Sequence, residues 1–243
     1  MYDEPKFTLA GDQAVSVELG NEIDPAVNKR IHSLKRIVQE RSIPGLRDLI
    51  PTYNSLLVQY DPITIGLEDL QNIVVDAFGN LDEHSTDSIR IVLLPTLYGG
   101  EYGPDLEFIS DQASMTKEEV VTTHSSTDYL VYMLGFTPGF PYLGGLDNRL
   151  ATPRLETPRP TIPSGSVGIA ENQTGVYPTV SPGGWRLIGR TPLDLFDAYR
   201  EPASLISAGD YVRFVPLTDE SQFSEIRSQI KLGNYEVSIE WSQ

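Results

Sequence analysis

The stretch SVGIAENQTGVYPTVSPGGWRLIGR, residues 166–190, decides the fold class of the second half of this sequence. Its apolar segments are short, and glycine or proline separates each from the next. Short apolar segments between turn residues are typical of strands in a β-barrel or a β-sandwich. The same texture continues to about residue 216, so we predict a mainly-β domain here.

The segment GFTPGFPYLGGL, residues 135–146, lies just before that region and leaves two interpretations open. Its four glycines and two prolines exclude a helix. Its two phenylalanines and one tyrosine make it too apolar for an ordinary solvated loop. The segment is therefore either a structural corner of a β-rich core or the wall of a binding site.

The first third of the chain has the pattern of a compact α+β unit. KFTLAG and AVSVEL alternate with the period of two that strands require. Asp24 and Pro25 predict a helix start, because Asp is a good N-cap and the N–H that Pro lacks would be unpaired there. An apolar stripe continues this helix through Val27, Ile31, Leu34 and Val38. A second strand pair and a second helix, 66–78, complete the order ββαββα, which predicts a ferredoxin-like α+β domain.

The polar segment GNLDEHSTDS, residues 79–88, predicts the boundary between two domains. We place a small α/β domain at residues 1–84 and a mainly-β domain at residues 85–243. Within the second domain, Thr116 begins a capping-box pattern that predicts a short helix to Thr123. The alternating tail NYEVSIEWS, residues 234–242, is expected to close a sheet.

Composition excludes several classes of function. The net charge of −16 argues against nucleic-acid binding, because a phosphate backbone would be repelled. With no cysteine, disulfides, thiolate nucleophiles and iron–sulfur clusters are excluded. No signal peptide and no run of the roughly 18 apolar residues that a membrane span needs are present, so we expect a cytoplasmic protein.

The common catalytic motifs are also missing from the sequence. It contains neither Gly-x-x-x-x-Gly-Lys-Ser/Thr nor Gly-x-Ser-x-Gly. Its three histidines, His32, His84 and His124, have no zinc-binding spacing, so no metal site is expected. His124 lies between the capped helix and an apolar strand, where it is either a buried, hydrogen-bonded histidine or a site residue.

Arginine is unusually concentrated between residues 149 and 200, where there are six arginines and no lysine. Its planar fork suits carboxylate and phosphate groups. Arg154 and Arg159 each follow a proline, which stiffens the chain and limits where they point. They either bind an anion or hydrogen-bond the free carbonyls of the surrounding loops.

The segment YPTVSPGGWRLIGRTP, residues 177–192, combines aromatic rings with charge. Tyr177 and Trp185 supply flat apolar area, and Arg186 and Arg190 supply positive charge. This is the composition of a concave binding site, although aromatic residues in a β domain also form cores. The glycine pair before Trp185 favours exposure of its indole ring.

Four long motifs occur together in order: YGGEYGPDL, HSSTDYLVYMLGFTPGFPYLGGL, PRLETPRPTIPSGSVGIAENQTGVYP and SPGGWRLIGRTPLDLFD. With them the sequence resembles the allophanate hydrolase subunit 1 family over nearly its whole length. Known members include the B subunit of bacterial ATP-dependent 5-oxoprolinase and the sporulation kinase inhibitor KipI. The resemblance implies a small N-terminal α/β domain followed by a cyclophilin-like β-barrel domain.

The resemblance also implies partners and a reaction. The expected partners are a protein of the allophanate hydrolase subunit 2 family, which is the C subunit of 5-oxoprolinase, and the A subunit of the same enzyme. Together they convert 5-oxo-L-proline, ATP and two water molecules to L-glutamate, ADP and phosphate. ATP is therefore expected at the level of the complex, since this chain alone lacks a phosphate-loop motif.

Carried onto this sequence, the resemblance implies roles for individual residues. His124 is the expected acid or base, and Arg154, Arg159 and Arg190 are the expected anion holders. The expected substrate-binding walls and polar orienters are Phe140, Tyr142, Gln173, Tyr177 and Trp185. Two other functions remain open: a KipI-type inhibitor that binds a sensor histidine kinase, and a component of a urea or allophanate pathway.

Overall fold

The computed structural model describes residues 1–81 and 88–242 of the chain. The chain divides into two compact units, Met1–Asp87 and Ser88–Gln243. The predicted boundary between residues 84 and 85, and His84 with it, lie outside the described residues. Each unit has its own hydrophobic core.

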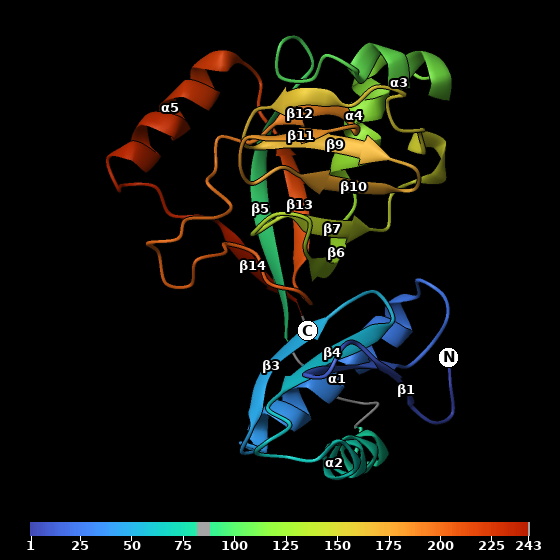
Figure 1. Cartoon of the computed structure of the whole chain (residues 1–243). Coiled ribbons are helices and arrows are strands. Elements are labelled where there is room, and N and C mark those ends of the chain that lie inside the picture. Colours follow the sequence, from blue (N-terminus) through green and yellow to red (C-terminus); the bar gives the residue numbers. More distant parts are fainter. Residues whose placement is uncertain (82–87, 243) are drawn as a thin grey trace. The chain divides into compact units, whose positions relative to one another are not determined.

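The first unit is a four-stranded antiparallel sheet with two helices (Figure 1). Its elements are β1 (Lys6–Leu9), β2 (Ala14–Glu18), α1 (Pro25–Glu40), β3 (Leu46–Pro51), β4 (Ser55–Tyr60) and α2 (Leu67–Gly79). The strand order is β1-β2-β4-β3, so α1 connects two strands that both flank β4. The element order ββαββα agrees with the pattern in the sequence, while the ferredoxin-like comparison stays a prediction.

Local signals set the start of α1. The Asp24 side chain accepts hydrogen bonds from the backbone N–H groups of Ala26 and Val27, at 2.6 and 3.4 Å, and Pro25 is the first helical residue. The predicted apolar stripe of α1 is buried against alternate residues of β2 and β4, including Val17, Leu56 and Val58. Capping and burial thus follow the sequence pattern.

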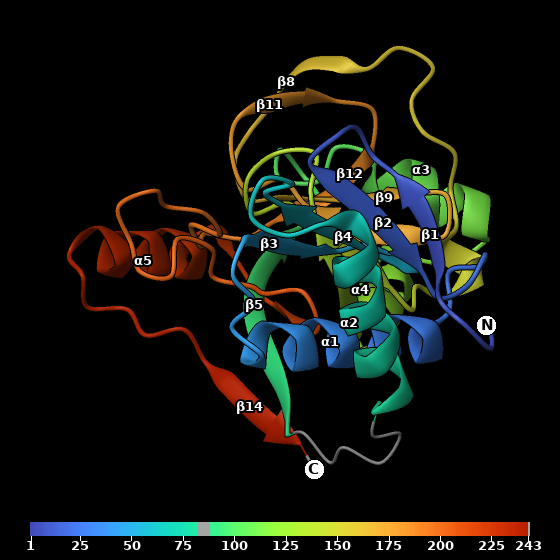
Figure 2. The same cartoon turned by 60° about the horizontal axis from the view of Figure 1, so that its bottom comes forward.

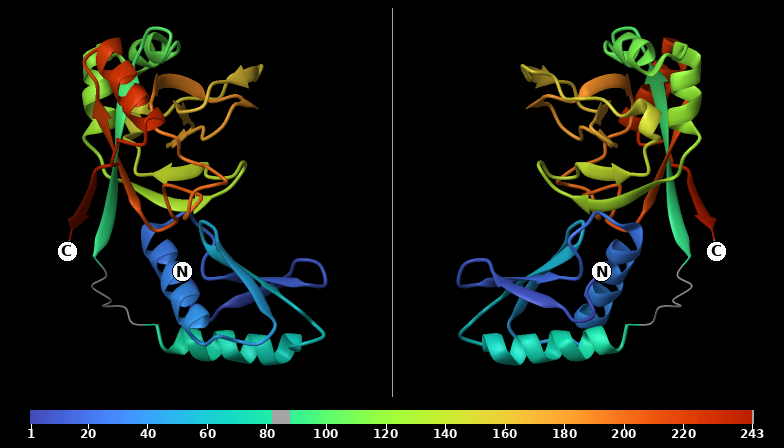
Figure 3. Two further views of the ribbon diagram at one scale, coloured as in Figure 1. Left: turned by 90° about the vertical axis from the view of Figure 1, so that its left-hand side faces the viewer. Right: turned by 90° about the vertical axis from the view of Figure 1, so that its right-hand side faces the viewer.

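The second unit is a closed β-barrel with helices around it (Figures 1 and 3). Its strands are β5 (Ile89–Tyr98), β6 (Tyr129–Leu134), β7 (Pro141–Gly144), β8 (Arg159–Ile162), β9 (Ser166–Ala170), β10 (Gln173–Val176), β11 (Ser181–Gly183), β12 (Arg186–Arg190), β13 (Tyr211–Pro216) and β14 (Ile239–Ser242). Its helices are α3 (Leu106–Ala113), α4 (Lys117–Ser125), the 3-10 turn η1 (Asn148–Leu150) and α5 (Glu220–Lys231). The prediction of a barrel is confirmed, while its likeness to cyclophilins stays a prediction.

Strand pairing closes the barrel in the order β5-β12-β9-β10-β7-β6-β13 and back to β5. The expectation that the C-terminal tail completes a sheet is confirmed in part, since β14 is the last strand of the eight-stranded sheet. Only Ile239–Ser242 forms a strand, and β14 pairs with the first part of β5 instead of closing the barrel. Closure comes from β12, whose Gly189 and Arg190 pair with Tyr98 and Leu97 of β5.

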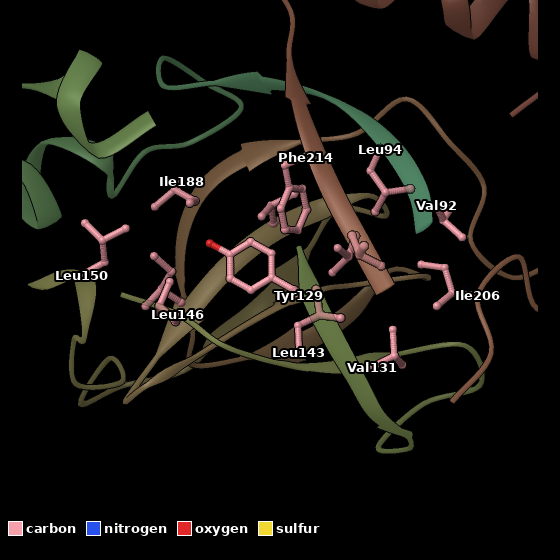
Figure 4. Close-up of a cluster of buried hydrophobic side chains, with 14 of the residues drawn as sticks. Val92, Leu94, Tyr129, Val131, Leu143, Leu146, Leu150, Ile188, Ile206 and Phe214 are labelled. Carbon is pink, nitrogen blue, oxygen red and sulfur yellow. The ribbon is translucent and has the colours of Figure 1, made fainter. Parts of the chain in front are cut away.

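The barrel interior holds the main core of this unit, with Tyr129, Leu143 and Phe214 near its middle (Figure 4). The ring centroids of Tyr129 and Phe214 lie 5.6 Å apart. Successive residues of a strand point to opposite sides of a sheet. On β10, Val176 accordingly belongs to the interior core, while the following Tyr177 belongs to a second, smaller core outside the wall.

A separate two-stranded ribbon, β8 with β11, lies outside the barrel wall (Figures 2 and 3). Arg159 pairs with Gly183, and Ile162 pairs with Ser181. The chain enters β9 from β8 and leaves β10 into β11, so the ribbon continues the β9–β10 hairpin. The ribbon and the wall beneath it enclose the second core.

Candidate functional site

His124 lies at the end of α4, in the interior of the barrel, and is 0% exposed. Its Nδ1 is 2.8 Å from the Tyr98 hydroxyl and its Nε2 is 2.9 Å from Thr174 Oγ1. Thr174 Oγ1 in turn donates to the Gly168 carbonyl at 3.0 Å. Both ring nitrogens therefore have partners.

The direction of this chain of hydrogen bonds fixes the state of the imidazole. Because the Thr174 hydroxyl donates to a carbonyl, it accepts from His124, which places the ring proton on Nε2. Nδ1 is then an acceptor for the Tyr98 hydroxyl. Burial lowers the pKa of His124 from its ordinary value of 6.5 to about 3, so the ring is neutral at physiological pH. This geometry favours the interpretation of His124 as a buried, hydrogen-bonded histidine.

Four predicted substrate-binding residues form an aromatic cluster on the outer side of the barrel wall: the expected walls Phe140, Tyr142 and Trp185, and the expected polar orienter Tyr177. The Phe140 ring centroid lies 5.0 Å from Tyr142, 5.3 Å from Tyr177 and 5.5 Å from Trp185, each in an edge-on arrangement. Such edge-on pairs are favoured by the ring quadrupoles. The segment around Phe140 is thus both a corner of the fold and part of this cluster.

Most of the aromatic cluster is buried. Phe140 is 2% exposed, Tyr177 1% and Trp185 5%, while Tyr142 is half-buried. The expectation that the glycine pair exposes Trp185 was wrong. Gly183 instead lets the backbone pass close to Tyr177, since a Cβ there would lie 2.3 Å from the Tyr177 hydroxyl. The aromatic rings are therefore packed beneath the surface, and the exposed side chain next to them is that of Arg154.

Two predicted arginines lie against Trp185. The Arg154 guanidinium is 6.0 Å from the centre of the Trp185 ring, and its side chain is exposed. Arg159 Nη1 donates to the Trp185 carbonyl at 3.5 Å, and its Nη2 forms an ion pair with Asp105 Oδ1 at 2.9 Å. Both arginines therefore place positive charge beside Trp185, and Arg159 is held there by its hydrogen bond and its ion pair.

Asp105 is the site residue that sequence reasoning missed. Its Oδ2 accepts from the Leu187 backbone N–H at 2.6 Å, and its own N–H donates to the Leu187 carbonyl at 2.9 Å. Asp105 is 7% exposed and immediately precedes α3, so it fastens that helix to β12 while it pairs with Arg159. The available signal was a Gly-Pro-Asp sequence before an amphipathic segment, but α3 was itself not predicted.

Arg190 lies away from the Trp185 ring, whereas Gln173 lies on the same side of β10 as Gly175. Arg190 ends β12 and its guanidinium is 5.2 Å from the centre of the Tyr102 ring. Since Trp185 precedes the opposite end of that strand, the two are separated by its length. Gln173 begins β10 and faces Ala170, a member of the aromatic cluster's core, across the ladder.

The structure thus brings together six of the nine predicted site residues. The six are Phe140, Tyr142, Arg154, Arg159, Tyr177 and Trp185. We call these six residues together with Asp105 the arginine–aromatic face. His124 is separated from them by the barrel wall, because its partner Thr174 points inward from β10 while Gly175 faces Trp185 on the other side.

The described residues contain no group of three or more His, Asp or Glu side chains placed to hold a metal ion. In the same residues, no helix has both the length and the apolar character needed to cross a membrane. The chemistry that the arginine–aromatic face supports is the binding of a small anion or of a flat group with a negative charge.

The comparisons with known proteins agree on one family for this chain. The family described as carboxyltransferase domain, subdomain C and D, matches residues 5–206. The B subunit of the Bacillus subtilis (strain 168) 5-oxoprolinase is 43% identical over 220 residues, covering 86% of this chain and 92% of that protein. The B subunit of the Haemophilus influenzae 5-oxoprolinase is 50% identical over 191 residues, covering 78% of this chain and 84% of that protein. These matches confirm the resemblance seen in the sequence motifs.

A solved structure extends the likeness over the whole fold. The Kluyveromyces lactis urea carboxylase matches with a TM-score of 0.77 and 23% identity, covering 98% of this chain and 24% of that one. At this identity, the likeness concerns the fold alone.

Proposed function

The chain belongs to the family of carboxyltransferase domains, subdomains C and D, and from that premise we propose that it is the B-type subunit of an ATP-dependent 5-oxoprolinase. The assembled enzyme would hydrolyse 5-oxo-L-proline to L-glutamate. The observation that carries this proposal is the similarity, over most of the chain, to proteins named as the B subunits of 5-oxoprolinases.

The arginine–aromatic face suits part of this reaction. An unstrained lactam resists water, so its amide oxygen must be activated, and phosphorylation by ATP would do this. Activation places negative charge on the substrate, which Arg154 and Arg159 would stabilise. Arg159 is held in place by Asp105, and preorganised charge stabilises a transition state best. Arg154 lies 6.0 Å from the centre of the Trp185 ring.

The proposed reaction needs more than this chain supplies. The sequence has no phosphate-loop motif, so we assign ATP to the complex and not to this chain. His124 is buried and neutral, so we assign the group that moves the proton to one of the partner proteins. The proposed partners are the C subunit, which is a protein of the subunit 2 family, and the A subunit of 5-oxoprolinase.

Reconstitution tests the proposal directly. Purified alone, the chain should release neither glutamate from 5-oxo-L-proline nor ADP from ATP. Adding the two partner proteins should produce glutamate and ADP in equal amounts. A complete, folded mixture of the three proteins that leaves both substrates untouched would refute the proposed function.

Arginine substitutions test the face within the active complex. Arg154→Ala and Arg159→Ala should each lower kcat/KM, because each removes a cation from the site. Arg149→Ala is the matched control. Arg149 lies on η1, is exposed, pairs with Asp147 and is outside the arginine–aromatic face. Wild-type turnover and assembly in both test variants would remove these arginines from the proposal.

The two alternative functions can be separated with the same preparation. A KipI-type inhibitor should block autophosphorylation of its sensor histidine kinase when no other protein is added. A urea or allophanate component should support turnover of urea or allophanate in place of 5-oxo-L-proline. Neither alternative has a specific contact in the described residues that favours it over the oxoprolinase.

A further inference from the structure

Arg186 is a nearly buried arginine whose hydrogen-bonding capacity is unused. Its side chain is 17% exposed, and its Nε is buried with no partner. Within residues 1–81 and 88–242, its contacts are the Phe108 ring, 3.7 Å from the guanidinium carbon, and Asp105 Oδ1, 3.9 Å from Nη1. A distance of 3.9 Å is too long for a hydrogen bond.

The charge at this point is also unbalanced. Arg159 and Arg186 both approach the same oxygen of Asp105, and Arg159 holds it at 2.9 Å. The other Asp105 oxygen is occupied by the Leu187 N–H. Two guanidinium groups therefore share one carboxylate, which leaves about one uncompensated positive charge beside the arginine–aromatic face.

Burying an arginine without hydrogen-bond partners destabilises a protein, so such a group usually has a partner in the functional state. The planar fork of arginine matches a carboxylate in a bidentate arrangement. Phe108 holds the guanidinium by its face, and because Nε is buried, the Nη groups are those that a ligand can reach. Phe108 is itself 41% exposed on α3, so the site lies near the surface.

We propose that Arg186 is a specificity-determining residue that binds the carboxylate of a small amide substrate. This inference rests on the proposed function, in which the substrate is a lactam that carries one carboxylate. Arg186 would bind the carboxylate, while Arg154 and Arg159 remain available for charge that develops at the amide.

The test compares Arg186→Gln and Arg186→Lys with wild type in the reconstituted complex. Arg186→Gln should raise the KM for 5-oxo-L-proline by about 10- to 100-fold with kcat little changed, because a charge-assisted bond made in the ground state is lost. Arg186→Lys should recover only part of this effect, since lysine keeps the charge but not the fork. Arg149→Gln, outside the face, should leave KM unchanged.

A neutral analogue separates recognition from structural damage. 2-Pyrrolidinone is the same lactam without the carboxylate, so its inhibition constant should be equal in wild type and Arg186→Gln. If this constant rises together with KM, Arg186 has a structural role and the proposal is overturned. An unchanged KM in Arg186→Gln overturns it as well.

A second measurement keeps this inference separate from the proposed function. In the isolated chain, 5-oxo-L-proline should shift the Arg186 Nε–Hε signal in NMR spectra, and 2-pyrrolidinone should not. An inactive wild-type complex with this selective shift would refute the oxoprolinase function but support the carboxylate site. Absence of the shift at millimolar ligand, with an active complex and unchanged KM in the variants, would refute the site alone.

Discussion

The neutral, buried state of His124 predicts a specific loss of stability in mild acid. In the folded chain, burial lowers the pKa of His124 from 6.5 to about 3. In the unfolded chain, the ring is in water and titrates near its ordinary pKa of about 6.5. Between these two values the unfolded state binds one more proton than the folded state, so the free energy of unfolding falls as pH falls. Above a pH of about 6.5 the stability contribution is fully present.

The magnitude follows from the difference between the two states. At about 1.36 kcal/mol per pKa unit, protonation of the unfolded chain near pH 5 costs the folded protein about 2 kcal/mol relative to a pH of about 7.5. The substitution His124→Gln removes the titrating group and retains a neutral donor and acceptor for Thr174 and Tyr98. Carboxylates contribute equally to both proteins, so their effect cancels in the comparison.

Urea unfolding at these two pH values measures this difference. Both tryptophans, Trp185 and Trp241, belong to the second unit, so their fluorescence follows the unit that contains His124. Between the two pH values, wild type should lose about 2 kcal/mol more than His124→Gln. A loss equal in both proteins would mean that His124 is not held neutral, and the hydrogen-bond directions assigned to its ring nitrogens would be wrong.

Three further substitutions test packing, helix capping and an ion pair by urea unfolding. Gly175→Ala should lower the free energy of unfolding by about 1–3 kcal/mol, because its Cβ would lie 2.9 Å from the Trp185 ring. In the control Gly79→Ala, the Cβ would have nothing within 4 Å and the change should be neutral or stabilising. Similar losses in both variants would contradict the close packing of Gly175 against Trp185. Thr116→Ala should cost about 1 kcal/mol by removing the capping box of α4, and an unchanged stability would show that the cap is dispensable. Asp105→Asn should lower the free energy of unfolding by about 1–2 kcal/mol, because it removes the ion pair with Arg159. The activity of the reconstituted complex should remain altered even at a low temperature at which this variant is folded.

Elements with local signals could be predicted from the sequence. The Asp24–Pro25 start of α1 and the Thr116 start of α4 both depend on residues within one helical turn, and both are present in the structure. Helices α3 and α5 were missed. The Asp105 side chain makes no capping bond to α3. Asp219 does cap α5, accepting from the Gln222 N–H at 3.0 Å, but α5 has no buried residue and so lacks a clear apolar stripe.

The candidate site was harder to predict than the fold because it depends on pairings distant in sequence. The chain alternates inward and outward along β10, so Thr174 lies with His124 inside the barrel while Gly175 lies against Trp185 outside it. Sequence reasoning placed His124 and Trp185 in one site because it could not assign the two faces of the strand. Asp105 and Arg159 are 54 residues apart, and no local pattern could have paired them.

The ionisable groups of the arginine–aromatic face suggest why this chain would need partners. Arginine keeps its proton in proteins, so Arg154, Arg159 and the adjacent Arg186 can bind charge but cannot transfer a proton. The two oxygens of Asp105 already accept from Arg159 and from the Leu187 N–H. Burial raises the pKa of Tyr142 and of Tyr177 above the ordinary value of 10, so neither phenol ionises at neutral pH. Lactam hydrolysis needs a proton at the leaving nitrogen and a base for water. If the face binds the substrate, these groups must come from another surface, and an active complex should show a pH dependence that no substitution within the arginine–aromatic face removes.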